Sequence, residues 1–221
     1  MKSSRNAKFG IFVTGTDTGV GKTVVAAGLL SRFRAGGVDA VPMKPVQTGC
    51  RLVQGRQVAP DLAFCLKAIR LNPGRRDMAD MAPYRFSPAC SPHLAAKEAG
   101  DRISLPVIER AFRRLSRAHE VVVVEGAGGV LVPLNDRHTM LDLMIRLRLP
   151  VLLVARPGLG TLNHTLLSLQ TLHGAGLTVL GVILNQAAPG RWGRIEDDNV
   201  RTIERFGGVK VLECVRYGET V

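Results

Sequence analysis

The chain has 221 residues, of which 46% are hydrophobic, and a formal net charge of +12. This length predicts one full hydrophobic core in a single domain over residues 1–221 and argues against two comfortable domains. The positive charge predicts attraction to anions in general, nucleotides and nucleic acid included, without choosing between them.

The sequence predicts a soluble, cytoplasmic protein. Apolar runs such as Val121–Val124 are far shorter than the roughly 20 residues of a membrane-spanning helix. Residues 1–8 are basic and polar, and no apolar run of signal-peptide length follows them. The four cysteines include no Cys-x-x-Cys pair, which favours reduced thiols over a zinc site or a disulfide framework.

The first expected strand, residues 9–14, runs into a glycine-rich turn, Gly15-Thr16-Asp17-Thr18-Gly19-Val20-Gly21-Lys22-Thr23. Such a turn, followed by a helix over residues 22–34, surrounds a polyphosphate with backbone N–H groups and the positive end of the helix dipole. Lys22 can reach the outer phosphates and the Thr23 hydroxyl can bind Mg²⁺. Five residues rather than four separate Gly15 from Gly21, so the loop is one residue longer than the standard pattern.

The rest of the chain alternates strand-like and helix-like segments. Further strands are expected at residues 38–43, 121–125, 150–155, 177–184 and 209–212. Further helices are expected at residues 61–69, 105–118, 140–147, 162–173 and 197–206. Apolar strands separated by helices predict a three-layer α/β/α fold with a mostly parallel central sheet. Residues 50–60 suggest a mobile loop, and the prolines of residues 72–92 suggest an irregular crossing over the sheet edge.

Two charged residues mark the ends of expected strands, where ligands of parallel sheets bind. Lys44 follows the second strand, and we expect it beside the phosphate loop because the second βα unit would neighbour the first; the alternative is a solvated charge. Glu125 ends the run of four valines, and a buried carboxylate needs a cation. Mg²⁺ held by Thr23 is the obvious candidate, since Mg²⁺ takes one or two carboxylates plus phosphate oxygens.

A basic face is expected on the helix over residues 105–118. Its arginines recur at helical spacing: Arg110, Arg113, Arg114 and Arg117. A solvated helix face is the favoured interpretation, and a docking patch for an acidic partner is the alternative. With 5% aromatic residues and none interleaved with the arginines, nucleic-acid binding is a weak interpretation.

With these residues assembled, the chain resembles the dethiobiotin synthetase family. Six ordered blocks over about residues 9–190 carry the resemblance: the phosphate loop, Lys44-Pro45-Val46-x-Thr48-Gly49, Ser91-Pro92-His93-Leu94-Ala95-Ala96, Val124-Glu125-Gly126-Ala127-Gly128-Gly129, Gly158-Leu159-Gly160-Thr161-Leu162-Asn163-His164 and Gly181-Val182-Ile183-Leu184-Asn185. The resemblance implies a P-loop ligase that uses ATP and Mg²⁺ to turn 7,8-diaminononanoate and CO₂ into dethiobiotin, ADP and phosphate. In that family an amine forms a carbamate, ATP phosphorylates it, and the second amine closes the ring.

The resemblance also implies residue roles. Lys44, Lys22 and Thr18 would be catalytic, and Thr48 would contact the substrate amine or carbamate. Asn163 would bind the substrate carboxylate across a subunit boundary, so that a homodimer completes the site. The ATP-binding residues would be Gly19, Val20, Gly21, Lys22, Thr23, Val24, Asp61, Glu125, Gly126, Ala127, Gly128, Asn185 and Gln186. The metal would be held by Thr23, Asp61 and Glu125.

Several of these roles have alternatives. Asp61 and Asn163 could instead cap the starts of helices, and Asn185 could be a turn residue. Some family members place a carboxylate at the position of Gly19, so no acidic role carries over there. Residues 212–217 lack the Ile-Pro-x-Leu-like stretch of the family, which leaves the nucleotide-base pocket and the preference for ATP open.

Two rival functions share the phosphate loop. A nucleotide switch of the partitioning-ATPase type, with a basic surface that binds DNA or a partner, would carry an extra lysine early in the loop; this chain has Thr14, Thr16 and Asp17 there. An amidoligase would need a source of ammonia, usually a glutaminase domain, for which this chain has no room. Both are therefore weaker interpretations than ring closure.

Overall fold

The computed structural model describes residues 9–53 and 56–219 and contains a six-stranded, all-parallel sheet. The strand order is β10-β9-β8-β1-β7-β2. The strands are β1 (Phe9–Gly15), β2 (Ala40–Met43), β7 (Val121–Gly129), β8 (Val151–Ala155), β9 (Val179–Asn185) and β10 (Val211–Val215). The expected strands are thus confirmed with shifts of a few residues at their ends.

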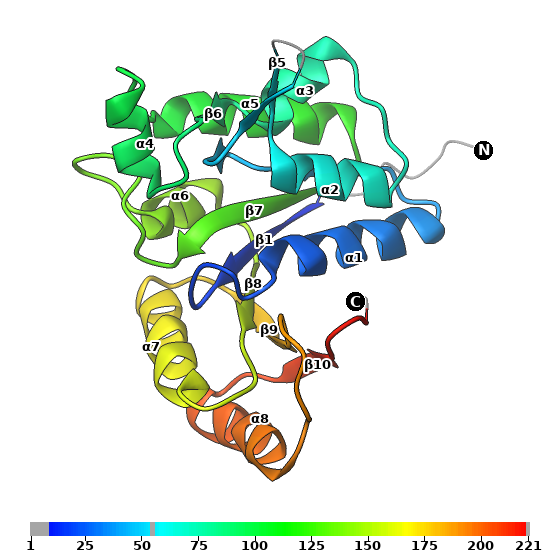
Figure 1. Cartoon of the computed structure of the whole chain (residues 1–221), viewed down its shortest axis with the longest axis vertical. Coiled ribbons are helices and arrows are strands. Elements are labelled where there is room, and N and C mark those ends of the chain that lie inside the picture. Colours follow the sequence, from blue (N-terminus) through cyan, green and yellow to red (C-terminus); the bar gives the residue numbers. More distant parts are fainter. Residues whose placement is uncertain (1–8, 54–55, 220–221) are drawn as a thin grey trace.

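Helices cover both faces of this sheet (Figure 1), which confirms the predicted three layers. Val13 and Val123 point toward Val25 of α1 (Lys22–Ala35), whereas Phe12 and Val124 point to the opposite face. That second face is covered by α5 (Leu105–Ala118), α6 (Met140–Leu147), α7 (Thr161–Gly174) and α8 (Arg194–Gly207). Because successive strand residues alternate between faces, an all-apolar strand serves both layers.

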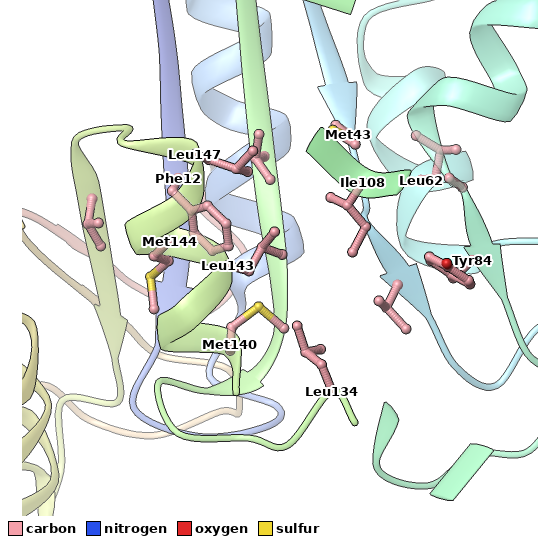
Figure 2. Packing of buried hydrophobic residues seen from close by; sticks show 14 of the residues in the cluster. Phe12, Met43, Leu62, Tyr84, Ile108, Leu134, Met140, Leu143, Met144 and Leu147 are labelled. Atoms are coloured by element: carbon pink, nitrogen blue, oxygen red, sulfur yellow. The ribbon is translucent and has the colours of Figure 1, made fainter. Parts of the chain in front are cut away.

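Helix α6 packs its apolar side against β1. In Figure 2, Met140, Leu143 and Met144 gather around Phe12, and all four side chains are fully buried. Burial of a side chain of this size contributes roughly 1.5–3 kcal/mol. This contact holds β1 in place from the face of the sheet opposite α1, and thereby helps to position the loop that follows β1.

Two segments differ from the sequence-based expectation. Strands β4 (Arg51–Val53) and β5 (Arg56–Val58) pair in antiparallel fashion and are followed by α2 (Pro60–Ala68), so the expectation of a loop is wrong for these strands, whereas residues 54–55 of that expected loop lie outside the described residues. The expected irregular crossing contains α3 (Arg75–Met81) and β6 (Tyr84–Arg85), which pairs with β3 (Val46–Gln47), and it leads into α4 (Pro92–Glu98). The prolines there bracket helices instead of breaking them: Pro92 begins α4, where a missing N–H costs nothing.

The order of the strands corrects a further expectation. Strand β7 lies between β1 and β2, since Val124 is in register with Phe12 on one side and with Met43 on the other. Strand β2 therefore does not neighbour β1, although α1 and α2 pack against each other. Lys44, which follows β2, lies next to Glu125 of β7, and it lines the same cavity as Lys22 and Thr23 of the phosphate loop, so its expected place beside that loop is confirmed.

The four arginines of the predicted basic face of α5 are exposed, which confirms the solvated face: Arg110, Arg113, Arg114 and Arg117. Arg114 donates from Nε to Oδ2 of the buried Asp80 on α3, over 2.8 Å. Arg113 pairs with Glu109 one turn earlier. Arg114 also neutralises the buried Asp80 carboxylate of a neighbouring helix, a partner that the spacing of the arginines did not predict, although its own side chain remains 43% exposed. No helix within the described ranges is long and apolar enough to cross a membrane.

Candidate active site

A hydrogen bond from Asn185 supports the phosphate loop. The side-chain nitrogen of Asn185 donates to the carbonyl of Val20 over 2.9 Å. At Gly21 the backbone has φ of +95°, and a Cβ there would lie 2.0 Å from that same nitrogen. No side chain caps the start of α1, so its first N–H groups remain free to bind an anion.

Lys22 lies folded back across the loop. Its ammonium donates to the carbonyl of Asp17 over 2.7 Å, and the Asp17 carboxylate pairs with Arg156 at 2.8 Å. Burial and the nearby charge of Lys44 lower the pKa of Lys22 to about 8. An incoming polyphosphate would offer this buried ammonium a full negative charge in place of a carbonyl.

Lys44 lies at the centre of the site, fully enclosed by two carboxylates. Its Nζ is 2.6 Å from Glu125 Oε1 and 2.7 Å from Asp61 Oδ2, and it also donates to the carbonyl of Gly126 over 3.1 Å. Burial alone would lower the pKa of Lys44, but the charges of Glu125 and Asp61 raise it above its ordinary value. The alternative of a solvated lysine is therefore wrong.

Asp61 enters the site from the first turn of α2. The N-cap of this helix is Ala59, so the interpretation of Asp61 as a helix cap is wrong. Its carboxylate is one-third exposed. Burial favours its neutral form, but Lys44 and a hydrogen bond from Gln47 outweigh this and keep the pKa of Asp61 below its ordinary value.

These groups line one cavity of about 670 Å³. Its walls bring together most of the predicted site residues: Thr18, Gly19, Gly21, Lys22, Thr23, Lys44, Thr48, Asp61, Glu125, Ala127 and Gly128. The Thr48 and Thr18 side chains thus share a space with the phosphate loop. The cavity is large enough for more than a triphosphate tail, so a second substrate can lie beside it.

The donor set at the base of the cavity fits Mg²⁺. Thr23 Oγ1 lies 2.8 Å from Glu125 Oε1. The carboxylates of Asp61 and Glu125 both contact the ammonium of Lys44, so they lie on either side of it. Within the described residues there is no cluster of three or more His, Cys, Asp or Glu that could hold a metal alone. Two carboxylates and a hydroxyl leave coordination positions for phosphate oxygens and water, as Mg²⁺ requires.

The remaining predicted residues lie outside the walls of this cavity as described: Val20, Val24, Gly126, Asn163, Asn185 and Gln186. Asn163 is an exposed residue in the first turn of α7, whose N-cap is Gly160, so its interpretation as a cap is wrong. Gln186 lines a separate cavity of about 500 Å³ with Arg216 and Tyr217, beyond the ends of β9 and β10.

Two functional features escaped the sequence analysis. Gln47, which contacts Asp61, falls at the one position of the Lys44 block left unspecified. Arg156, which pairs with Asp17, directly follows β8. The rule that ligand-binding residues follow parallel strands would have identified Arg156, whereas only the tertiary packing identifies Gln47.

Comparison with known proteins agrees with this architecture. A family model described as an AAA domain matches residues 9–221. Among solved structures, a ParA family ATPase from Chlorobium tepidum superposes with a TM-score of 0.59 and 15% identity, over 96% of this chain and 86% of that one. The signal recognition particle receptor FtsY from Elizabethkingia anophelis gives 0.54 and 16%, over 95% and 60%. These identities support a shared P-loop fold and nothing finer.

The sequence relatives are closer. The ATP-dependent dethiobiotin synthetase of Anaeromyxobacter dehalogenans (strain 2CP-C) is 46% identical over 180 residues, which cover 81% of this chain and 78% of the relative. Those of Nitrosospira multiformis and Halalkalibacterium halodurans are 42% and 40% identical, each over 95% of this chain and over 89% and 85% of their own lengths. The chain therefore belongs to the ATP-dependent dethiobiotin synthetase family of ligases.

Proposed function

We propose that this protein uses ATP, CO₂ and 7,8-diaminononanoate to make dethiobiotin, ADP and phosphate. Family membership supports dethiobiotin as the product and ATP as the co-substrate. The observation that carries the finer proposal is the shared cavity, in which Lys44 and Thr48 face the phosphate-loop residues Lys22 and Thr23.

The chemistry starts with a carbamate. A substrate amine attacks CO₂, forms a C–N bond and releases a proton. A carbamate oxygen then attacks the γ-phosphorus while the bond to the ADP oxygen breaks, which gives a carbamic–phosphoric anhydride. The second amine attacks the carbamate carbon, the bond to the phosphate oxygen breaks, and phosphate leaves as the ring closes.

Lys44 and Lys22 would offset the repulsion between the anionic groups that react. Carbamate and γ-phosphate are both anionic, so a cation must lie between them and stabilise the charge on the transferred group. We assign this role to Lys44 and assign the outer phosphates to Lys22. Thr48 would bind the amine or carbamate, with Thr18 close by. Mg²⁺, held by Thr23, Asp61 and Glu125, would neutralise phosphate charge.

A second subunit would complete the site. Asn163 is exposed and is not part of the cavity wall of its own chain, and we propose that it reaches the substrate of another copy of the chain. Leu159, just before α7, is 92% exposed, and Leu131 is 58% exposed. Large exposed apolar side chains such as these favour a contact with another chain, which we propose is a second copy. In that arrangement Asn163 binds the substrate carboxylate, far from the amines.

The nucleotide base would lie near Gln186, with Asn185 at the edge of the phosphate loop. The free cysteines of the described residues agree with a cytoplasmic enzyme that keeps its thiols reduced. We further propose that residues 1–221 act as one domain.

One reaction tests the proposal. The purified protein is mixed with diaminononanoate, bicarbonate, ATP and Mg²⁺, and dethiobiotin is sought by mass spectrometry. We expect product formation that depends on all four additions. ATP hydrolysis that ignores the diamine, or that only DNA stimulates, would overturn the proposal.

A further inference from the structure

Gln47 has a hydrogen-bonded backbone and is buried at the wall of the active-site cavity. It belongs to β3, in register with Arg85 of β6, and its carbonyl accepts from the Phe86 N–H over 2.8 Å. The side chain is only 4% exposed. A buried amide must find hydrogen-bond partners, so its partners indicate what it does.

Both ends of that amide bind one residue. Gln47 Oε1 accepts from the backbone N–H of Asp61 over 3.2 Å, and Gln47 Nε2 donates to Asp61 Oδ2 over 3.2 Å. Nε2 also donates to the carbonyl of Thr48 over 3.0 Å. The pair of bonds fixes the position of Asp61 and also the rotation of its carboxylate.

The oxygen that Gln47 holds is the oxygen that faces the reaction site. Asp61 Oδ2 is the atom 2.7 Å from Lys44 Nζ. Glu125 is buried and is fixed by Thr23 and Lys44, whereas the Asp61 side chain is one-third exposed on a helix with no side-chain cap. Of the two carboxylates, Asp61 is therefore the one that needs an outside group to aim it.

Only an amide of this length meets the requirement. The N–H of Asp61 is in the first turn of α2 and has no partner within the helix, so it needs an acceptor; the carboxylate needs a donor. Glutamine supplies both from one side chain. Glutamate would place a second negative charge against Asp61, and methionine would supply neither group.

We infer that Gln47 is a positioning residue that aims the Asp61 carboxylate at the cation site. It thereby sets the affinity for the divalent ion. The inference rests on the proposed function, because it takes Asp61 to be a metal ligand. Residues that orient metal ligands in this way typically change metal affinity by 10- to 100-fold when they are removed.

The test measures binding of Mn²⁺, which has a direct paramagnetic signal, to protein saturated with a non-hydrolysable ATP analogue. We expect Gln47→Met to weaken Mn²⁺ binding by about 10- to 100-fold, while binding of the analogue in EDTA stays within about twofold. Gln57→Met is the matched control, since Gln57 is exposed on β5 and should leave Mn²⁺ binding unchanged.

A double-mutant cycle separates positioning from a merely structural role. In an Asp61→Asn background, Gln47→Met should cause no further loss of Mn²⁺ affinity, because the group that it aims is already gone. An equal loss in both backgrounds, or unchanged Mn²⁺ affinity of Gln47→Met, overturns the inference. If Gln47→Met does not fold, Gln47→Asn keeps the amide but is too short to reach both atoms, and it should weaken Mn²⁺ binding as well.

The outcome is distinguishable from the fate of the proposed function. Mn²⁺ binding needs neither diamine nor bicarbonate. A protein that makes no dethiobiotin yet loses Mn²⁺ affinity in Gln47→Met would refute the reaction and support the positioning role. A protein that makes dethiobiotin while Gln47→Met binds Mn²⁺ normally would support the proposed reaction and refute the positioning role of Gln47.

Discussion

The ammonium of Lys44 lies 2.6 Å from Oε1 of Glu125, the same oxygen that accepts from the hydroxyl of Thr23. Lys44, which is proposed to bind the substrate, is therefore paired with Glu125 and Asp61, the two carboxylates that are proposed to bind the metal. A divalent cation cannot enter between Glu125 and Asp61 while the ammonium lies there. Occupation of the site should move Lys44 toward the anions of the substrates.

Removal of this lysine should tighten metal binding in the absence of nucleotide. In Lys44→Ala the two carboxylates lose the ammonium that lies between them, so an arriving cation no longer competes with it. We expect Mn²⁺ to bind about tenfold tighter than to the unaltered protein, since each 1.4 kcal/mol of removed repulsion is a factor of ten. Paramagnetic titration measures this, with Lys210→Ala, a remote exposed lysine, as the control. Weaker Mn²⁺ binding in Lys44→Ala would contradict the competition.

The same variant should separate nucleotide binding from ring closure. Lys22 and the backbone of the phosphate loop remain in Lys44→Ala, so an ATP analogue should bind within a few-fold of normal. Loss of the cation at the transferred group should lower dethiobiotin formation by about 10²- to 10³-fold, as for other groups that stabilise developing charge. Calorimetry and a product assay give the two numbers. A comparable loss of both would show that Lys44 serves ATP binding.

Nucleotide binding should take up a proton at alkaline pH. The lowered pKa of Lys22, about 8, means that its ammonium is mostly charged at pH 7 and mostly neutral at pH 9. Phosphates favour the charged form and raise the pKa, so affinity should fall by up to about tenfold per pH unit above 8.

Titrations of metal-free protein with ATP at pH 9, in two buffers of different ionisation enthalpy, measure the protons taken up. About one proton is expected at pH 9 and none at pH 7. The Lys22→Arg variant keeps its charge at both values of pH and should take up none. Uptake that persists in Lys22→Arg would assign the proton to another group.

Complementation between subunits tests the role of Asn163. Asn163→Ala and Lys44→Ala should each be poorly active alone. If one subunit supplies Lys44 and its partner supplies Asn163, a mixed dimer contains one intact site. Random mixing of equal amounts should then restore about a quarter of the normal activity per site. Mixtures that stay as inactive as the separate variants would show that each site is built from one chain.

The sequence predicted those parts of the site that depend on local order. The phosphate loop from Gly15 to Thr23 is a contiguous motif, and Lys44 and Glu125 directly follow apolar strands. Each was therefore found from the rule that ligand-binding groups follow parallel strands. Family resemblance then supplied Thr48 and Asp61.

What the sequence could not predict depends on the order of strands and on packing between distant segments. No local pattern shows that β7 enters between β1 and β2, so the sequence placed Lys44 beside the phosphate loop but did not predict that Glu125 of the intervening strand contacts both Lys44 and Thr23. The amide of Gln47 meets Asp61 only because β3 and α2 pack together. The arginine spacing of α5 predicted the exposed face correctly, but it could not show that Arg114 also pairs with Asp80, because Asp80 lies on another helix.

The pair of Arg114 and Asp80 gives a stability prediction. Asp80 is buried with 6% exposure, and Arg114 provides its charged partner from α5. Arg114→Ala should lower the free energy of unfolding by about 1–3 kcal/mol, because a buried carboxylate loses its donors. Arg113→Ala is the matched control: it removes an arginine from the preceding position of the same helix, which pairs only with the neighbouring Glu109 among the ion pairs described, and it should change stability by less than about 0.5 kcal/mol.

Urea unfolding of both variants measures the difference, and a third variant assigns its cause. Asp80→Asn removes the charge that needs a partner, so Arg114→Ala should cost clearly less in that background than in the unaltered protein. Equal losses in Arg114→Ala and Arg113→Ala, or an undiminished cost in the Asp80→Asn background, would show that the aliphatic part of Arg114 matters more than its charge. A drop confined to Arg114→Ala in the presence of Asp80 would show that this arginine joins α5 to α3.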